Sequence, residues 1–229
     1  MNIDPTNTKP PIDFFFERPV DVAGLSRSNN VARSMGAIAS RMVQEKRSRT
    51  VHPDGRRENV SEHENMLARV APHMAAEMYP WLDRGRIALY ATIHDDVEAY
   101  VGDTPTDSIA QHDPAAKKER ERLGVEQLVL EYQDIAPAYV NDILAYEAQG
   151  AEDYEAQFVR IVDKFMVLLI HIPNNGEVLL QNYTYDEYMS ATYESERKLL
   201  EQYPHFIELI EMRTELAQYI GDQVYKSAP

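Results

Sequence analysis

The feature that most constrains the fold of this chain is the spacing of its apolar residues, which recur at intervals of three and four over most of its length. This spacing gathers apolar side chains on one face of an α-helix, whereas the alternation typical of half-buried strands forms no convincing series here. Glycine is sparse, with 9 residues, and the 13 prolines concentrate at the start and at junctions. At 229 residues the chain can build one domain with a substantial core. We therefore predict a single all-α domain.

Helix start and stop signals divide the chain into an arm followed by six or seven helices. Residues 1–24 are Pro-rich and irregular, and we expect them to form an N-terminal arm ahead of one helical domain over 25–229. We expect breaks at Gly124 and Pro137, within the longest helical segment. The expected helical segments are 25–46, 61–78, 83–100, 114–149, 152–172, 186–202 and 204–225.

Composition excludes several classes of function. The 38 acidic residues outnumber the 23 Lys and Arg, and the resulting net charge of −15 argues against a nucleic-acid coat and against electrostatic membrane binding. No apolar run approaches the roughly 20 residues that span a bilayer. The start at Met1 to Pro5 lacks the basic and apolar segments of a signal peptide. We therefore expect a cytoplasmic protein that acts on neither nucleic acid nor membranes.

Cysteine is absent from the chain, which excludes disulfides, thiolate metal ligands and a cysteine nucleophile. Any transition-metal site must therefore be built from histidines and carboxylates.

Four ionisable residues lie where the apolar pattern predicts buried helix surfaces. His63 extends the apolar stripe of its predicted helix by one turn, and His94 and Asp95 lie in a helix that is apolar nearly all round. Asp163 lies in another strongly apolar helix. Buried charges need a partner or a cation. Two histidines with two aspartates form a mixed nitrogen and oxygen ligand set, which suits Mn, Co, Fe, Ni or Zn better than Ca or Mg alone.

Each of these residues alone has an ordinary alternative explanation. A histidine on an apolar face is more often a hydrogen-bonded core residue than a metal ligand, and a His-Asp dipeptide often occurs by chance. A purely structural helical interaction protein is the corresponding alternative for the whole chain. That alternative leaves the buried charge of Asp163 without an explanation.

Four short motifs give the chain a resemblance to the HD-domain metal-dependent phosphohydrolases, and most closely to the bacterial 5′-deoxynucleotidase group. They lie in order within residues 47–169, roughly half the chain, so the arm and the C-terminal helices over 186–225 lie outside the likeness. Each motif is weak alone, but four in this order are specific. The motifs are Arg57-Glu58-Asn59-Val60-Ser61-Glu62-His63, Ile93-His94-Asp95-Asp96-Val97-Glu98, Gly102-Asp103-Thr104-Pro105-Thr106 and Val162-Asp163-Lys164.

The resemblance implies an HD-domain helical bundle that holds one divalent transition metal ion, with Mg as a second or replacement ion. It implies that the metal ligands are His63, His94, Asp95 and Asp163.

Further roles follow from the same resemblance. Glu98 corresponds to the acidic residue that orients or deprotonates the attacking water, or protonates the leaving oxygen. Asp103 corresponds to an acidic residue behind the site, while Thr104 and Thr106 shape the rim of the pocket. A solvated helix end is the alternative interpretation of Glu98 and Asp103.

Positive charge is concentrated directly before His63. Residues 33–57 contain seven Lys and Arg against two acidic residues, in a chain whose overall charge is strongly negative. Arginine can bind phosphate through two parallel hydrogen bonds. In the resembling family an upstream arginine contacts the substrate phosphate, and Arg47 and Arg49 are both candidates because the spacing here departs from the usual pattern. A solvated basic helix end is the alternative.

The resemblance implies a hydrolase that converts (deoxy)nucleoside 5′-monophosphates to nucleoside and phosphate with a metal-activated water. A (d)NTP triphosphohydrolase or nucleotide pyrophosphatase of the same superfamily is the first alternative. A regulatory nucleotide-binding HD protein with little turnover is the second. The resemblance and the tyrosine-rich late helices also lead us to expect a homodimer.

Overall fold

The computed structural model describes residues 26–102 and 114–226. The expected arm over 1–24 lies outside this range, as do Asp103, Thr104 and Thr106. The elements, in chain order, are α1 (Arg27–Gln44), β1 (Lys46–Val51), β2 (Arg57–Asn59), α2 (Val60–Met78), α3 (Arg84–Ile93), α4 (Glu98–Val101), α5 (Pro114–Tyr132), α6 (Pro137–Glu147), α7 (Tyr154–His171), α8 (Glu177–Asn182), α9 (Tyr185–Gln202), the short 3₁₀ helix η2 (Pro204–Phe206) and α10 (Ile207–Lys226).

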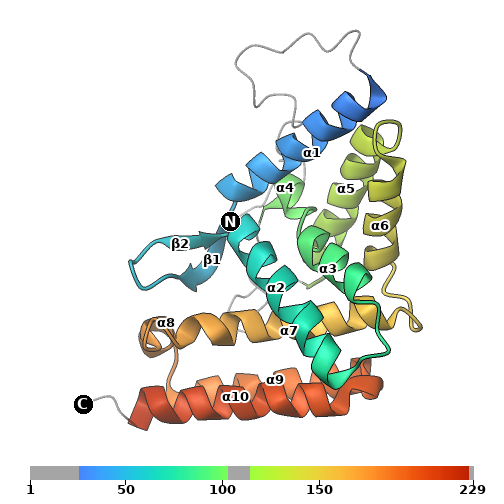
Figure 1. Ribbon diagram of the computed structural model, residues 1–229. Coiled ribbons are helices and arrows are strands. Elements are labelled where there is room, and N and C mark those ends of the chain that lie inside the picture. The colour runs from blue at the N-terminus through green and yellow to red at the C-terminus, as the bar shows by residue number, and fades with distance from the viewer. Residues whose placement is uncertain (1–25, 103–113, 227–229) are drawn as a thin grey trace.

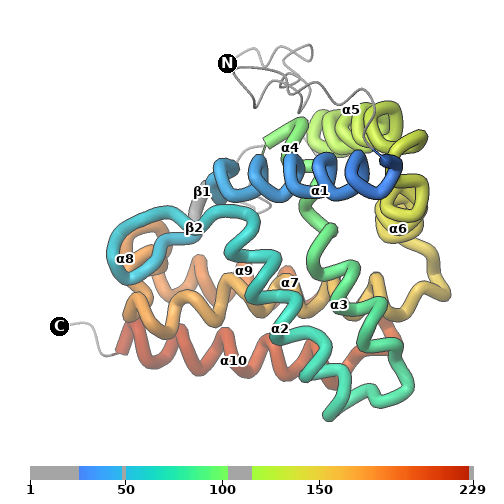
Figure 2. Tube along the Cα trace, turned by 45° about the horizontal axis from the view of Figure 1, so that its top comes forward, coloured from blue at the N-terminus to red at the C-terminus, as the bar shows by residue number. Residues whose placement is uncertain are grey.

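The helices form two groups that α2 and α3 connect (Figure 1). The long helices α7, α9 and α10 lie along one side, with α9 and α10 next to each other and α10 also against α7. Helices α1, α4, α5 and α6 lie on the opposite side, where α1 contacts α4 and α4 contacts α5 (Figure 2). Because α2 and α3 pack on each other and both pack on α7, they place their side chains at the centre of the molecule.

One large apolar cluster joins both groups of helices. Its fully buried members include Leu67 on α2, Ile87 on α3, Phe158 on α7 and Phe206 in η2, directly before α10. A smaller cluster joins the last turns of α7 to α8, α9 and α10; it consists of Leu168, Leu179, Tyr188, Met189, Ala217 and Ile220. The all-α prediction is confirmed. None of the helices in the described ranges is both long and apolar enough to cross a membrane.

The prediction of a single helix over 83–100 is wrong, because α3 ends at Ile93. The chain continues through a tighter turn, in which the amide of Asp96 donates to the carbonyl of Ile93 and the amide of Glu98 to that of Asp95. These bonds span three residues, as in a 3₁₀ turn, rather than the four of an α-helix. The turn brings His94 and Asp95 to the end of α3, where their side chains are not confined to the face of one straight helix.

Gly124 does not break the helix, contrary to expectation, and lies inside α5. Its role is close packing, because a Cβ at this position would lie 2.7 Å from Cγ1 of Val97 and 3.0 Å from Cγ1 of Val101. The expected break at Pro137 is confirmed, since Pro137 begins α6 and needs no intrahelical partner for its missing amide hydrogen.

Two further elements were not expected. β1 and β2 form an antiparallel pair with Lys46 opposite Asn59 and Val51 opposite Arg57. The strands are short and rich in charged residues, so the apolar alternation that would reveal them is missing. The short helix α8 begins after Gly176, whose φ of +68° permits the sharp reversal that follows α7.

Candidate metal centre

Local sequence fixes the start of α2, the helix that carries His63. The Asn59 side chain accepts a hydrogen bond from the Glu62 amide at 2.9 Å, and the Glu62 carboxylate accepts one from the Asn59 amide at 3.0 Å. This reciprocal pair is a capping box, which satisfies two amides that the helix itself leaves unpaired. His63 follows within the first turn and is only 1% exposed. Its position is therefore set by the junction between β2 and α2.

We predict that Asn59→Ala lowers the free energy of unfolding by about 1 kcal/mol, because alanine cannot accept the capping hydrogen bond. Asn65→Ala is the matched control: Asn65 is exposed in the interior of the same helix, where alanine is at least as favourable as asparagine. Urea unfolding of both variants measures the difference. Equal stability of the two variants would contradict the capping role.

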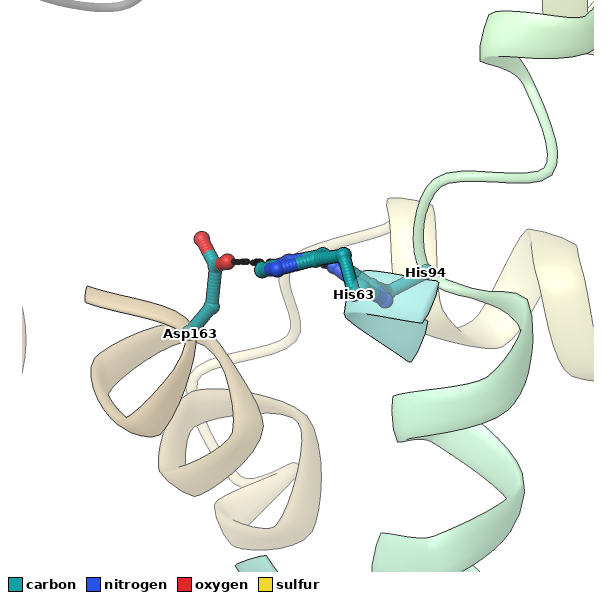
Figure 3. A group of neighbouring side chains, drawn as sticks. All are labelled: His63, His94 and Asp163. Carbon is teal, nitrogen blue, oxygen red and sulfur yellow. Dashed lines mark hydrogen bonds and ion pairs between the residues drawn. The ribbon is translucent and has the colours of Figure 1, made fainter. Parts of the chain in front are cut away.

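Three of the four predicted ligands meet in the centre of the fold. Nε2 of His63 lies 2.9 Å from Oδ1 of Asp163, and Nε2 of His94 lies 3.9 Å from the same oxygen. One ligand atom from each residue lies within 4.8 Å of the other two. Figure 3 shows the side chains pointing toward one another from α2, from the end of α3 and from α7. Two nitrogen donors and one carboxylate oxygen thus face a common point.

Asp95 lies beside this group rather than within it. Its Oδ2 is 3.2 Å from Nε2 of His94 and 3.8 Å from Nε2 of His63. The same oxygen accepts a hydrogen bond from Nη1 of Arg47 at 3.0 Å. Arg47, one of the two candidates for contact with the substrate phosphate, is therefore held against a predicted ligand. The side chain of Arg49, in β1, lies outside the described part of the structure.

The free atoms of the two histidines fit a divalent transition metal ion. Nδ1 of His94 lies 3.1 Å from the carbonyl of Ala91, to which it can only donate, so Nε2 is the nitrogen with a lone pair for a ligand. That Nε2 is buried and lacks a hydrogen bond within the described residues, since its contact with Asp95 is not in hydrogen-bonding geometry. Ligating histidines commonly donate their second ring nitrogen in this way.

Glu58 lies near the second ring nitrogen of His63, beyond hydrogen-bond distance. Its Oε2 is 4.0 Å from Nδ1 of His63 and 3.4 Å from Nε of Arg47, and the residue is 2% exposed. Burial raises the pKa of Glu58 to about 7, and Arg47 opposes this rise. Although Glu58 belongs to the first sequence motif, its role was not predicted. One signal in the sequence could have indicated this role: Glu58 is a charged residue directly before Asn59, which caps the helix that carries His63.

The electrostatics of His63 and Asp163 favour the forms that bind metal, whereas the pKa of His94 is raised. Burial would lower the pKa of His94, but the carboxylates of Asp95 and Asp163 outweigh that effect. Burial lowers the pKa of His63, so its ring stays neutral at neutral pH. Burial would raise the pKa of Asp163, but Lys164, whose Nζ lies 2.5 Å from Oδ2, and the hydrogen bond from His63 hold that pKa well below its usual range. Asp163 is therefore an anion facing two imidazoles.

A cavity of about 660 Å³ lies beside the cluster, and residues of α9 and α10 also line it. His94, Asp95, Glu98 and Asp163 are in its lining, so Glu98 faces the same space as three of the predicted ligands. The basic residues in the lining are Arg47, Lys117, Arg120, Arg160, Lys164, Lys198 and Arg213, and the acidic ones are Asp95, Glu98, Glu121, Glu147, Asp163 and Glu194. The Lys and Arg of the lining thus outnumber its Asp and Glu, the reverse of the chain as a whole, which favours an anionic ligand here over the rest of the surface.

Comparisons with known proteins agree with this geometry. The model of a family described as HD domain matches residues 39–204. The crystal structure of a predicted metal-dependent phosphohydrolase from Magnetospirillum magnetotacticum MS-1 is similar over 88% of this chain and 94% of that chain, with 27% sequence identity and a TM-score of 0.63. No curated protein matches the chain.

Proposed function

This chain belongs to the HD domain family and is a metal-dependent phosphohydrolase of that type, and we propose that it hydrolyses nucleoside 5′-monophosphates. The observation that carries the proposal is the group formed by His63, His94 and Asp163, of which His94 and Asp163 line a cavity that also contains seven Lys and Arg. The cavity of about 660 Å³ lies within the range of about 300–1,000 Å³ that is typical of small-ligand sites.

We propose that His63, His94 and Asp163 hold a divalent transition metal ion, with Asp95 as a fourth ligand. Asp95 can join them if Arg47 shifts its hydrogen bond, because Oδ2 already lies within 4 Å of both imidazoles. Bound there, the ion polarises a phosphoryl oxygen and lowers the pKa of a water molecule. The residues of the chain then orient the substrate and move the protons.

Glu98 is the proposed acid–base residue of the hydrolysis. It begins α4 directly after the turn that carries His94 and Asp95, and it lines the cavity beside them. A carboxylate in this place can accept a proton from the attacking water or pass one to the leaving oxygen. Arg47, which also lines the cavity, is positioned to contact the substrate phosphate once Asp95 binds the metal.

We predict that Glu98→Gln lowers kcat about a hundredfold while metal content is unchanged, because glutamine keeps the shape but cannot transfer the proton. Steady-state kinetics with elemental analysis of the same samples separates the two effects. Glu215→Gln is the control, since Glu215 is exposed on α10 and outside the cavity lining. A kcat equal to that of the unchanged chain would remove Glu98 from the chemistry.

A (d)NTP triphosphohydrolase is the second candidate, and the basic lining supports it. Lys117, Arg120, Arg160 and Lys198 lie in the cavity in addition to the residues next to the metal ligands. A monophosphate needs few of these charges, whereas a triphosphate chain carries more negative charge to neutralise.

Phosphate release from nucleoside mono-, di- and triphosphates in the presence of Mn, Co, Zn or Mg tests the proposal. Release from monophosphates alone, lost in a His94→Ala/Asp95→Ala variant, supports the nucleotidase. Release of triphosphate or of successive phosphates supports the second candidate. Metal binding without turnover of any nucleotide would favour the regulatory alternative and contradict the nucleotidase.

We also propose that the protein forms a homodimer. Tyr193 on α9 and Tyr219 on α10 are both at least half exposed, and tyrosine is common in protein interfaces. A sedimentation coefficient that stays at the value for a 26.3 kDa species over micromolar concentrations would exclude it.

A further inference from the structure

Arg213 is a buried cation without an ion-pair partner in the described part of the chain. It lies on α10 and is 7% exposed, and its Nε and Nη1 atoms are buried without a hydrogen bond within the described residues. Tyr188 and Glu196 are the neighbours that act on its charge, but no carboxylate of the described residues lies within ion-pair distance. An uncompensated buried charge is strongly destabilising. This arrangement suggests that a ligand supplies the missing anion.

A second unpaired group lines the same cavity. His171, at the end of α7, is 5% exposed, and its Nδ1 is buried without a partner in the described ranges. Both His171 and Arg213 line the cavity that contains the metal centre. Thr192, a buried residue on α9, is in the lining as well and adds a hydroxyl group. Three buried polar side chains from three helices thus border one space.

The surroundings of Arg213 differ from those of the metal centre. The charged and titratable residues that act on Arg213 are Tyr188 and Glu196, rather than Asp95 or Asp163. Arg213 also lies beyond the residues 39–204 that match the HD domain. Arg213 therefore belongs to a part of the cavity lining that the metal ligands do not share.

We propose that Arg213 forms the centre of a second anion-binding subsite that takes a phosphate-like group, in the lining that it shares with Thr192. The guanidinium can form two parallel hydrogen bonds to such a group. The anion is either the far end of the substrate, an assignment that rests on the proposed function, or a separate inorganic anion in the same cavity. The subsite itself exists without hydrolysis, so it can be tested without metal.

The first experiment measures binding of inorganic phosphate by calorimetry to the full chain after chelation of metal. We expect Arg213→Met to weaken phosphate binding at least about tenfold, because methionine removes the charge-assisted hydrogen bonds of the guanidinium. Arg197→Met is the matched control on α9, where Arg197 is exposed and pairs with Glu201. Arg213→Gln gives the same readout should the methionine variant not fold. Phosphate binding unchanged in the Arg213 variants, or absent from the unchanged chain, would overturn the subsite.

The second experiment identifies the source of the anion. In the metal-loaded enzyme, KM is compared for a nucleoside 5′-monophosphate and the 3′,5′-bisphosphate. A rise in KM for the bisphosphate alone in Arg213→Met assigns the subsite to the substrate. If Arg213→Met loses phosphate binding but leaves both KM values unchanged, the subsite binds a separate anion. Without turnover of either nucleotide the proposed function fails, while the calorimetry still decides whether the subsite exists.

Thermal stability separates a ligand site from a structural role. Because Arg213 has no ion-pair partner among the described residues, Arg213→Met is expected to keep or raise the melting temperature. A large fall in melting temperature with phosphate binding intact would show that Arg213 acts only in packing.

Discussion

Asp163→Asn is expected to abolish metal binding and to lower the rate of phosphate release at least about a thousandfold. Asparagine keeps the shape of the side chain but removes the negative charge that faces His63 and His94. Loss of a residue that merely orients a metal ligand already lowers affinity or activity by about ten- to a hundredfold. Loss of a ligand also removes the stabilisation of transition-state charge by the ion, which contributes several kcal/mol.

Elemental analysis and initial rates of the purified variant measure both effects. Asp134→Asn is the control, because Asp134 is exposed between α5 and α6 and the same change of charge occurs far from the cluster. Full metal content in Asp163→Asn would show that Asp163 is not a ligand. Full activity with reduced metal content would contradict the metal-dependent chemistry.

Phe206→Ala is expected to lower the free energy of unfolding by about 3–5 kcal/mol, which is typical of removing a buried aromatic side chain. Phe206 is 0% exposed, and its ring lies 5.1 Å from that of Tyr79 and 5.9 Å from that of Phe158. These contacts tie the start of α10 to the end of α2 and to α7. For a chain of this size the melting temperature should fall by about 6–20 °C.

The matched control is Ile207→Ala, because Ile207 is the next residue and is 50% exposed. Its effect should stay within about 0.5 kcal/mol. Urea unfolding should show one transition for both variants if residues 26–226 form a single cooperative domain. A separate early transition in Phe206→Ala would mean that α9 and α10 unfold independently of the metal centre.

The long helices could be predicted because their apolar periodicity is repeated over several turns. α2, α7, α9 and α10 lie close to the expected ranges. The boundaries of α2 carry local signals, with a capping box at Asn59 and Pro80 just past its end. Where local chemistry alone determines an element, the sequence is therefore sufficient to predict it.

Tertiary packing decides the elements that the sequence did not reveal. A glycine within a helical pattern suggests a helix break. At Gly124, however, the absence of a side chain lets α5 pack closely against Val97 and Val101. The end of α3 before His94 carries no Gly or Pro, and the break is visible only in the hydrogen bonds of the turn. The β1–β2 pair has too few apolar residues to show alternation.

Some residues of the candidate site could be predicted from the sequence, and others could not. His63, His94, Asp95 and Asp163 could be predicted as a group, since ionisable residues in apolar helices stand out from their surroundings. Glu58 gains its role only from its distance to His63, which depends on how β2 enters α2. Arg213 could not be found from sequence, because an arginine on an amphipathic helix is usually exposed. Only the packed structure shows that it is buried without an anion among residues 26–102 and 114–226.

The most direct test of the central claim is a metal titration of the chelated enzyme. The purified chain is stripped of metal, and phosphate release from a nucleoside 5′-monophosphate is measured as Mn²⁺ is added. We predict no release without metal and a rise that ends at one ion per chain, with no rise in Asp163→Asn. Full phosphate release from the metal-free chain, or equal activation of Asp163→Asn, would contradict the claim that His63, His94 and Asp163 form the catalytic metal centre.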